Sequence, residues 1–148
     1  MDVSDLIDEE LVVFDAAIST KEELLRAAAR LFAAKGYATS EEGLLEAFHK
    51  RELEANTGVE GGFGIPHAKT AAVAKPALAF FHVGTMPDYI GLDDEPIDCS
   101  FAIVCPEGGA DVHLDILSRL IRKLVDEDFR NELRAAQSPA EVMAVLAG

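Results

Sequence analysis

One histidine stands out among the residues that could do chemistry, because the chain around it is rich in glycine. His67 follows Pro66 near the end of GVEGGFGIPHAK, residues 58–69, where four of the first seven positions are glycine. Glycine lets backbone N–H groups approach a ligand closely, and proline fixes the backbone dihedral beside the histidine. We therefore expect His67 to be held in a defined direction, as a nucleophile or an acid–base group.

The residues alone leave two other interpretations of this segment open. A nucleotide-binding loop is disfavoured, because the segment lacks GxxxxGK[ST] and follows an expected helix instead of a strand. A structural turn with an incidental surface histidine is the second alternative. Pro66 favours the chemical interpretation, since it also restricts Ile65 to extended conformations and so orients the ring that follows.

Two further residues are candidates to bind an anion held at His67. Arg51 lies just upstream in HKREL, and a guanidinium forms bidentate contacts with a phosphoryl group. His113 is expected in the first turn of a helix, where free N–H groups favour an anion and the helix dipole lowers the pKa of a histidine. The alternatives are a solvated arginine and a helix-start histidine without a role.

The other two histidines and both cysteines are expected to be structural. His49 lies on an expected helix and His82 in an expected strand, each partly buried with its polar atoms satisfied. Cys99 and Cys105 are too far apart along one apolar strand to form a disulfide, so we expect two buried thiols. A zinc site built from both cysteines and a histidine is not expected, because no CxxC or HxxxH spacing is present.

Composition limits the classes of protein that the chain can represent. Its 148 residues are 49% hydrophobic and include 27 acidic and 13 basic residues, a formal net charge of −14. This charge would repel a nucleic acid, whereas it suits a basic protein partner, solubility or adaptation to salt. No run approaches the roughly 20 apolar residues of a membrane helix, and the acidic start MDVSDLIDEE is unlike a secretory signal. We expect a single-domain, cytoplasmic protein that does not span a membrane.

Capping residues and apolar spacing predict four helices. The first begins after Thr20 and ends at Gly36, the second opens at Ser40 and carries Arg51 near its end, and the last follows Ser138. Between the second helix and the last, an amphipathic helix is expected over residues 111–125. Its expected apolar face consists of Leu114, Leu117, Leu120, Ile121 and Leu124.

Strands are expected between these helices, at residues 11–14, 77–83 and 97–104. The segment 97–104 is nearly apolar on both faces and is therefore expected at the centre of a sheet. Helices before, between and after strands, without internal repeats, favour a layered α/β or α+β domain.

The residues around His67 resemble enzyme IIA of the bacterial sugar phosphotransferase system, of the fructose/mannitol type. RELEANTGVEGGFGIPHA, residues 51–68, is similar to the family's RE…TG…G…IPHA signature. HLDILSRL at 113–120 is similar to its HL..L..L helix. The resemblance implies one such domain over residues 1–148, an α/β sandwich in which α-helices flank a mixed β-sheet.

The resemblance also implies a role for each candidate residue. His67 would be the phosphorylated histidine, His113 the second active-site histidine and Arg51 the phosphate-binding arginine. Phe63 stands where many members have a smaller residue, so we expect it to narrow the site or to pack on the partner. The residues expected to shape the pocket are Asn56, Thr57, Gly64 and Pro66.

The activity implied is that of a phosphotransferase without a metal or cofactor. A phosphoryl group would pass from the phosphohistidine of HPr to His67 and then to a IIB domain during uptake of a sugar, fructose first among the candidates. The alternative is a nitrogen-type regulatory IIA protein, which signals by phosphorylation-dependent binding to a kinase or channel. The oligomeric state is left open.

Overall fold

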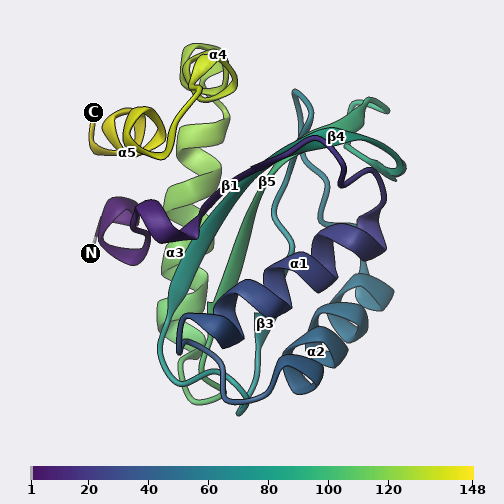
Figure 1. Ribbon diagram of the computed structural model, residues 1–148, viewed down its shortest axis with the longest axis vertical. Helices are drawn as coiled ribbons and strands as arrows, with labels where there is room; N and C mark the ends of the chain where they lie inside the picture. Colours follow the sequence, from purple (N-terminus) through teal and green to yellow (C-terminus); the bar gives the residue numbers. More distant parts are fainter. Residues whose placement is uncertain (1) are drawn as a thin grey trace.

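A five-stranded sheet with helices on both faces forms the protein (Figure 1). The computed structural model describes residues 2–148 and, apart from Ala110, their side chains. The short 3-10 helices η1 and η2 span Val3–Leu6 and Glu9–Leu11, and the strands are β1 Val12–Asp15, β2 Phe63–Gly64, β3 His67–Lys69, β4 Ala77–Ile90 and β5 Pro96–Cys105. The helices are α1 Lys21–Ala34, α2 Glu41–Glu54, α3 Ala110–Leu124, α4 Glu127–Ala135 and α5 Pro139–Ala147.

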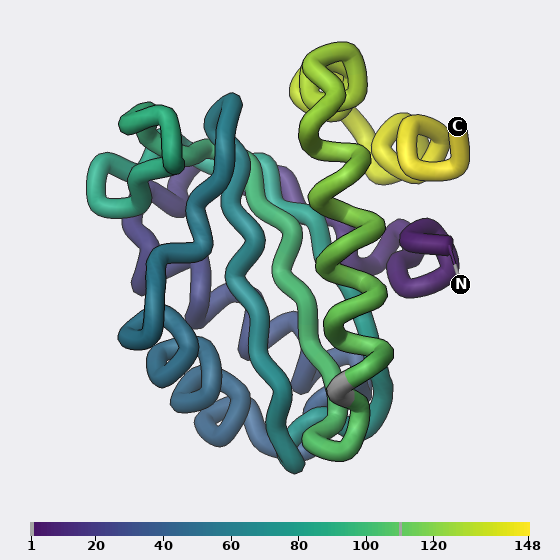
Figure 2. The backbone as a smooth tube through the Cα atoms, turned by 180° about the vertical axis from the view of Figure 1, so that it is seen from behind, coloured from purple at the N-terminus to yellow at the C-terminus, as the bar shows by residue number. Residues whose placement is uncertain are grey.

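The sheet is mixed, as the resemblance implied. β5 is its centre, because it pairs antiparallel with β4 and parallel with both β2 and β3, while β1 runs parallel to β4 on the far side. α1 and α2 lie on one face and α3 lies on the other, which is seen from behind in Figure 2. The expected α/β sandwich is confirmed, and so is the central position of the 97–104 strand.

β4 is twice as long as the strand expected at 77–83. Its first half is apolar and pairs regularly with β5, whereas the pairing shifts register twice between His82 and Ile90. Thr85, Pro87 and Asp88 interrupt the apolar pattern in this second half. An irregular edge with polar residues and a proline does not produce the alternation by which a strand is recognised.

The helix starts expected from capping residues are confirmed. The side chains of Thr20, Ser40 and Ser138 each accept a backbone N–H of the first turn. Gly36 follows α1 in a left-handed conformation, with φ of 84°. α4 was not expected, although Asp126 caps it and Phe129 and Leu133 are buried beneath it. Within residues 2–148, no helix combines the length and apolarity needed to cross a membrane.

The buried face of α3 differs from the expected one. Ile116, Leu120 and Leu124 are buried against the sheet, whereas Leu114 is 64% exposed and Ile121 is 42% exposed. The apolar stripe of α3 is therefore wider than the surface that the sheet covers, and an apolar strip of the helix is left in contact with solvent.

Candidate functional site

His67 is anchored to the sheet by its own backbone and by that of its neighbour. It begins β3 opposite Ile103 of β5, and the Ile103 N–H donates to the carbonyl of Pro66 at 3.0 Å. The residue is buried, with 7% of its surface exposed. His67 therefore lies at the start of a short strand, and not on the pliable loop that the glycine content indicated.

Both ring nitrogens of His67 have a partner. Nδ1 lies 2.8 Å from the carbonyl oxygen of Ile65, and Nε2 lies 2.9 Å from Nε of Arg51. An arginine can only donate and a carbonyl can only accept. Nδ1 therefore carries the proton, and the lone pair of Nε2 points toward the guanidinium. Nε2 is the nucleophilic atom of this ring.

The surroundings keep this imidazole neutral. Burial lowers the pKa of His67 below its ordinary value, and the positive charge of Arg51 lowers it further. The hydrogen bond that Nδ1–H donates to Ile65 acts in the opposite direction, but burial is the larger effect. A neutral ring with an available lone pair is the form that a nucleophilic histidine requires.

Arg51 lies in the last turn of α2 and uses only part of its donor capacity inside the protein. Nε donates to His67, and Nη1 donates to the carbonyl of Ala55 at 2.9 Å. A guanidinium has five N–H groups in a fixed plane. The N–H groups that remain can hold an anion beside Nε2 of His67 without loss of these two hydrogen bonds.

His113 approaches His67 from α3, which lies on the opposite face of the sheet from α2 and Arg51. It lies in the first turn of α3, and the centroids of the two imidazole rings are 5.0 Å apart. Its Nδ1 is enclosed and has no hydrogen-bond partner within the described chain. Burial lowers the pKa of His113 to about 4, with further contributions from His67, Lys69 and Arg51. The three expected residues, Arg51, His67 and His113, are thus brought together.

The depressed pKa of His113 predicts a component of acid sensitivity. Between pH 6.5 and about 4, the unfolded chain binds a proton at this residue and the folded protein does not, so stability falls as pH falls through this range. Replacing His113 by glutamine removes the component. Because His113 is only partly buried, solvent screening reduces this component to about 1 kcal/mol, and we expect Tm to fall less in the variant by roughly 2–4 °C. Thermal unfolding from pH 7.5 to pH 4 measures the difference, and parallel curves for the two proteins would contradict the prediction.

The side chains of Asn56 and Thr57 bind neighbouring segments of the protein. Nδ2 of Asn56 donates to the carbonyl of Ile90 at 2.6 Å, which ties the segment to the end of β4. The buried hydroxyl of Thr57 donates to Glu52 at 2.7 Å and contacts the hydroxyl of Tyr89 at 2.5 Å. Since Glu52 adjoins Arg51 on α2, this chain of hydrogen bonds joins the base of the site to β4.

This hydrogen-bonded support also includes Glu52, Tyr89 and Lys21, whose roles were not expected from the sequence. Lys21 pairs with Glu52 and lies 4.7 Å from the centroid of the Tyr89 ring. The position of Glu52 next to Arg51 in the RE pair was the one available signal. Tyr89 lies in the irregular half of β4, where the sequence pattern gave no strand.

The glycines are explained by packing and backbone conformation. Gly61 and Gly62 have φ of 69° and 81°, which favours glycine. A Cβ atom at Gly64 would lie 2.5 Å from the Tyr89 hydroxyl, and one at Gly58 would lie 2.4 Å from the Ile90 carbonyl oxygen. The N–H groups of Gly58 and Gly61 bond to Asn56 and Asp93. The expectation that glycine N–H groups reach the ligand is therefore wrong for Gly58 and Gly61.

Phe63 does not narrow the site or present itself to a partner. Its side chain is fully buried, its ring stacks on Phe101 with centroids 6.5 Å apart, and Arg134 covers its other surface. The expected role of Phe63 is wrong, because β2 directs this side chain into the core.

The other histidines and the cysteines lie outside this site. His49 is 44% exposed in its side chain and bonds to Glu22, with Nε2 2.5 and 2.8 Å from the two carboxylate oxygens. His82 is partly buried beside Phe14, with ring centroids 6.1 Å apart. Cys99 and Cys105 are free and buried, as expected.

A buried neutral histidine beside an arginine and a second histidine is an arrangement suited to holding and transferring an anion. The model of the family "Phosphoenolpyruvate-dependent sugar phosphotransferase system, EIIA 2" matches residues 5–148. The chain belongs to this family and is a phosphotransfer component of EIIA type.

Three proteins illustrate the similarity. The chain is 40% identical, over 146 residues, to a fructose-specific EIIA component of Haloferax volcanii, covering 99% of this chain and 95% of that one. It is 30% identical, over 147 residues, to a nitrogen regulatory protein of Bradyrhizobium diazoefficiens, with coverage of 99% and 95%. The crystal structure of the nitrogen regulatory protein IIA-Ntr from Neisseria meningitidis has a TM-score of 0.89, at 26% identity and 97% and 98% coverage.

Proposed function

We propose that the protein is a phosphocarrier, which accepts a phosphoryl group from phospho-HPr on Nε2 of His67 and passes it to a IIB domain. The observation that carries the proposal is the hydrogen bonding of His67. Its Nδ1–H is bound to the Ile65 carbonyl, and its Nε2 faces a cation that can also bind phosphate. The family membership supports the same chemistry.

The transfer is a displacement at phosphorus. The lone pair of Nε2 forms a P–N bond, while the P–N bond to the donor's histidine breaks and the donor ring leaves with the electron pair. Arg51 is placed to neutralise the phosphoryl oxygens, and His113 can offer a hydrogen bond from its imidazole. As the ring of His67 gains positive character, its bound Nδ1–H contact to Ile65 becomes stronger. In the onward step, the acceptor atom of the IIB domain forms the new bond to phosphorus, the P–N bond to Nε2 breaks, and the electron pair of that bond returns to the ring of His67.

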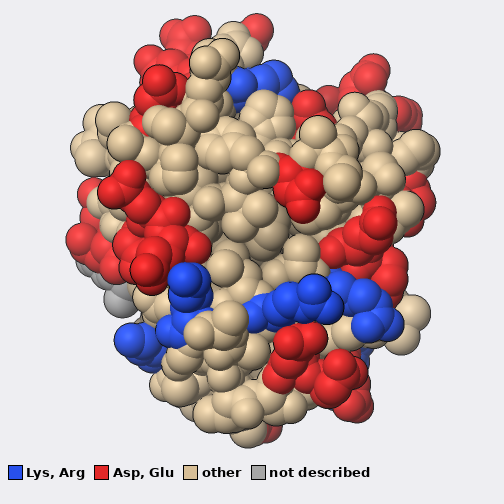
Figure 3. Space-filling view, in the orientation of Figure 1, with Lys and Arg blue, Asp and Glu red and all other residues tan. Residues whose placement is uncertain are grey.

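An exposed leucine beside the site fits a protein that docks on transient partners. Leu114 adjoins His113 in α3 and is 64% exposed. Acidic side chains surround the face on which α1 and α2 lie, and a band of Lys and Arg crosses it (Figure 3). Apolar contact beside the site, with charged side chains around it, suits a complex that forms and dissociates repeatedly.

Replacing Leu114 by asparagine is expected to weaken docking and to leave the chemistry unchanged. The substitution removes apolar contact area without adding charge near the phosphoryl group. We expect the concentration of phospho-HPr at half-maximal rate to rise about tenfold, which corresponds to a loss of about 1.4 kcal/mol, with the maximal rate retained.

Leu92 supplies the matched control for this measurement, because it is 75% exposed and lies beside the C-terminal end of α3. Leu92→Asn should leave the rate curve unchanged. An equal effect of both substitutions, or none at Leu114, would contradict a docking role for the surface beside His113.

Fructose is the sugar we propose, on the strength of the fructose-specific relative. The second candidate function is regulation of the nitrogen type, in which phosphorylated and unphosphorylated forms bind a kinase or channel differently. The nitrogen regulatory relative and the high TM-score of IIA-Ntr favour considering it.

Transfer from the phosphorylated protein to candidate IIB domains distinguishes the two functions. The protein is labelled with phosphate from phospho-HPr, freed of HPr and mixed with IIB domains for fructose and for mannitol. Rapid loss of label to the fructose IIB domain supports the transport role. Stable label in the presence of each IIB domain would overturn that role and favour regulation.

A further inference from the structure

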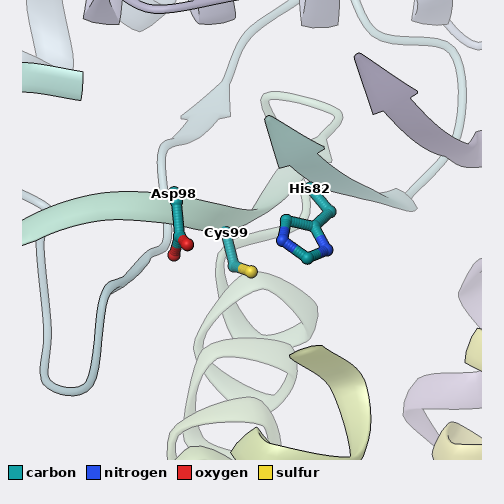
Figure 4. A group of neighbouring side chains, drawn as sticks. All are labelled: His82, Asp98 and Cys99. Carbon is teal, nitrogen blue, oxygen red and sulfur yellow. The ribbon is translucent and has the colours of Figure 1, made fainter. Parts of the chain in front are cut away.

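A second group of chemically active side chains lies away from His67. The side chains of His82 on β4 and of Asp98 and Cys99 on β5 point to the side of the sheet where α3 lies (Figure 4). One nitrogen, one oxygen and one sulfur atom of the three lie within 4.8 Å of one another. We propose that His82, Asp98 and Cys99 bind a divalent transition-metal ion, zinc in the first place.

The strand pairing explains how residues far apart in sequence reach one place. His82 and Cys99 are partners in the antiparallel pairing of β4 and β5. The backbone N–H groups of Asp98 and Cys99 both donate to the carbonyl of Gly62, each at 3.1 Å. Two consecutive residues facing one acceptor form a bulge, which turns neighbouring side chains toward the same side of the strand. Asp98 therefore joins Cys99 and His82 instead of pointing to the opposite face.

The three donors form a set that suits zinc. Imidazole nitrogen, thiolate sulfur and carboxylate oxygen are its usual protein ligands, at about 2.0–2.3 Å from the metal. A tetrahedral ion with such bonds needs its ligand atoms roughly 3.5 Å apart, so the side chains would close by about 1 Å. A thiolate and a carboxylate balance the two charges of the ion, and water can complete the coordination. The proton of the Cys99 thiol would be released to solvent when the metal–sulfur bond forms.

Arg134 orients the carboxylate without occupying all of it. Its Nη2 donates to Oδ1 of Asp98 at 2.7 Å and to the carbonyl of Gly61 at 2.9 Å. Arg134 does not engage the second oxygen, Oδ2. Carboxylate ligands that also accept a hydrogen bond from the protein are typical of metal sites, because the bond fixes their direction.

The proposed site is separate from the phosphate site. His67 pairs with Ile103, four residues beyond Cys99 on β5, which is about 13 Å along the strand. A metal here would join β4 to β5 and, through Arg134, to α4, so its effect would be on stability. Sequence patterns do not indicate this site, because the ligands lack CxxC or HxxxH spacing and His82 meets Cys99 only through strand pairing.

Cobalt titration of the reduced full-length protein tests the proposal, because a thiolate bound to Co²⁺ gives a near-ultraviolet charge-transfer band. We expect the band to saturate at one equivalent, to disappear when Zn²⁺ is added, and Tm to rise in Zn²⁺. His82→Gln and Cys99→Ser should each weaken Zn²⁺ binding by at least tenfold. Cys105→Ser is the matched control, since this buried thiol lies six residues along the same strand and should leave the band intact.

Three results would each overturn the metal site. They are the absence of a saturable band in the wild-type protein, a band that survives His82→Gln unchanged, and a band that is lost in Cys105→Ser. Circular dichroism of each variant shows whether it is folded. Should Cys99→Ser fail to fold, the partly exposed His82 still allows the decision, because its replacement leaves the buried core intact.

Discussion

Replacing His67 by alanine is expected to abolish phosphorylation of the protein. Alanine removes Nε2, and the other imidazole of the site, on His113, has an enclosed Nδ1 that no described residue binds, unlike the anchored Nδ1 of His67. Intact-mass spectrometry at alkaline pH, after incubation with phosphoenolpyruvate, enzyme I and HPr, measures the result. The wild-type protein should gain one acid-labile phosphoryl group, and His67→Ala should gain none.

His49→Ala is the control for this experiment. It removes a histidine that is bound to Glu22 across α1 and α2 and does not take part in the site. This variant should be phosphorylated like the wild type. An acid-labile phosphoryl group on His67→Ala, detected under the same conditions, would refute the assignment of His67 as the acceptor.

Replacing Arg51 by alanine is expected to slow phosphoryl transfer on the order of 10²-fold, the usual effect of removing one preorganised donor from a charged transition state. The guanidinium both fixes Nε2 of His67 and lies where phosphoryl oxygens would gather. Its loss therefore removes charge stabilisation and orientation together. Rapid-quench measurement of the transfer from phospho-HPr, under saturating donor, gives the rate.

Arg26→Ala is the matched control, because Arg26 lies on the exposed side of α1 and, among residues 2–148, forms an ion pair only with Glu22 of the same helix. Arg51→Lys adds a finer test, since a lysine cannot donate to His67 and Ala55 at once while also holding phosphate. We expect it to fall between the wild type and Arg51→Ala. If the transfer rates of Arg51→Ala and Arg51→Lys equal that of Arg26→Ala, Arg51 does not take part in the transfer and has a structural role only.

The parts of the fold that were predictable are those with strong local signals. Thr20, Ser40 and Ser138 marked helix starts because capping depends on residues within one turn. The 97–104 strand was recognisable as central because it is apolar on both faces. Arg51, His67 and His113 could be named from their sequence context, and the strand pairing and helix ends bring them together.

The rest depends on contacts between distant segments. β2 and β3 are two and three residues long, too short for any alternation to be read. The close approach of Gly64 to Tyr89 could not be foreseen, and neither could the burial of Phe63, because both require the position of β4 and β5. For α3, periodicity gave the width of the apolar stripe but not the portion that the sheet would cover.

The anchoring of His67 at three points also bears on how fast such a protein can work. Its ring is held by Ile65 and Arg51, and the peptide before it is bound to Ile103 of β5. The entropy of ordering this acceptor is lost once, during folding, and not again at each meeting with a donor. A carrier built in this way does not wait for its acceptor to assemble. Its throughput is set by the frequency of productive encounters, and therefore by the abundance of its partners.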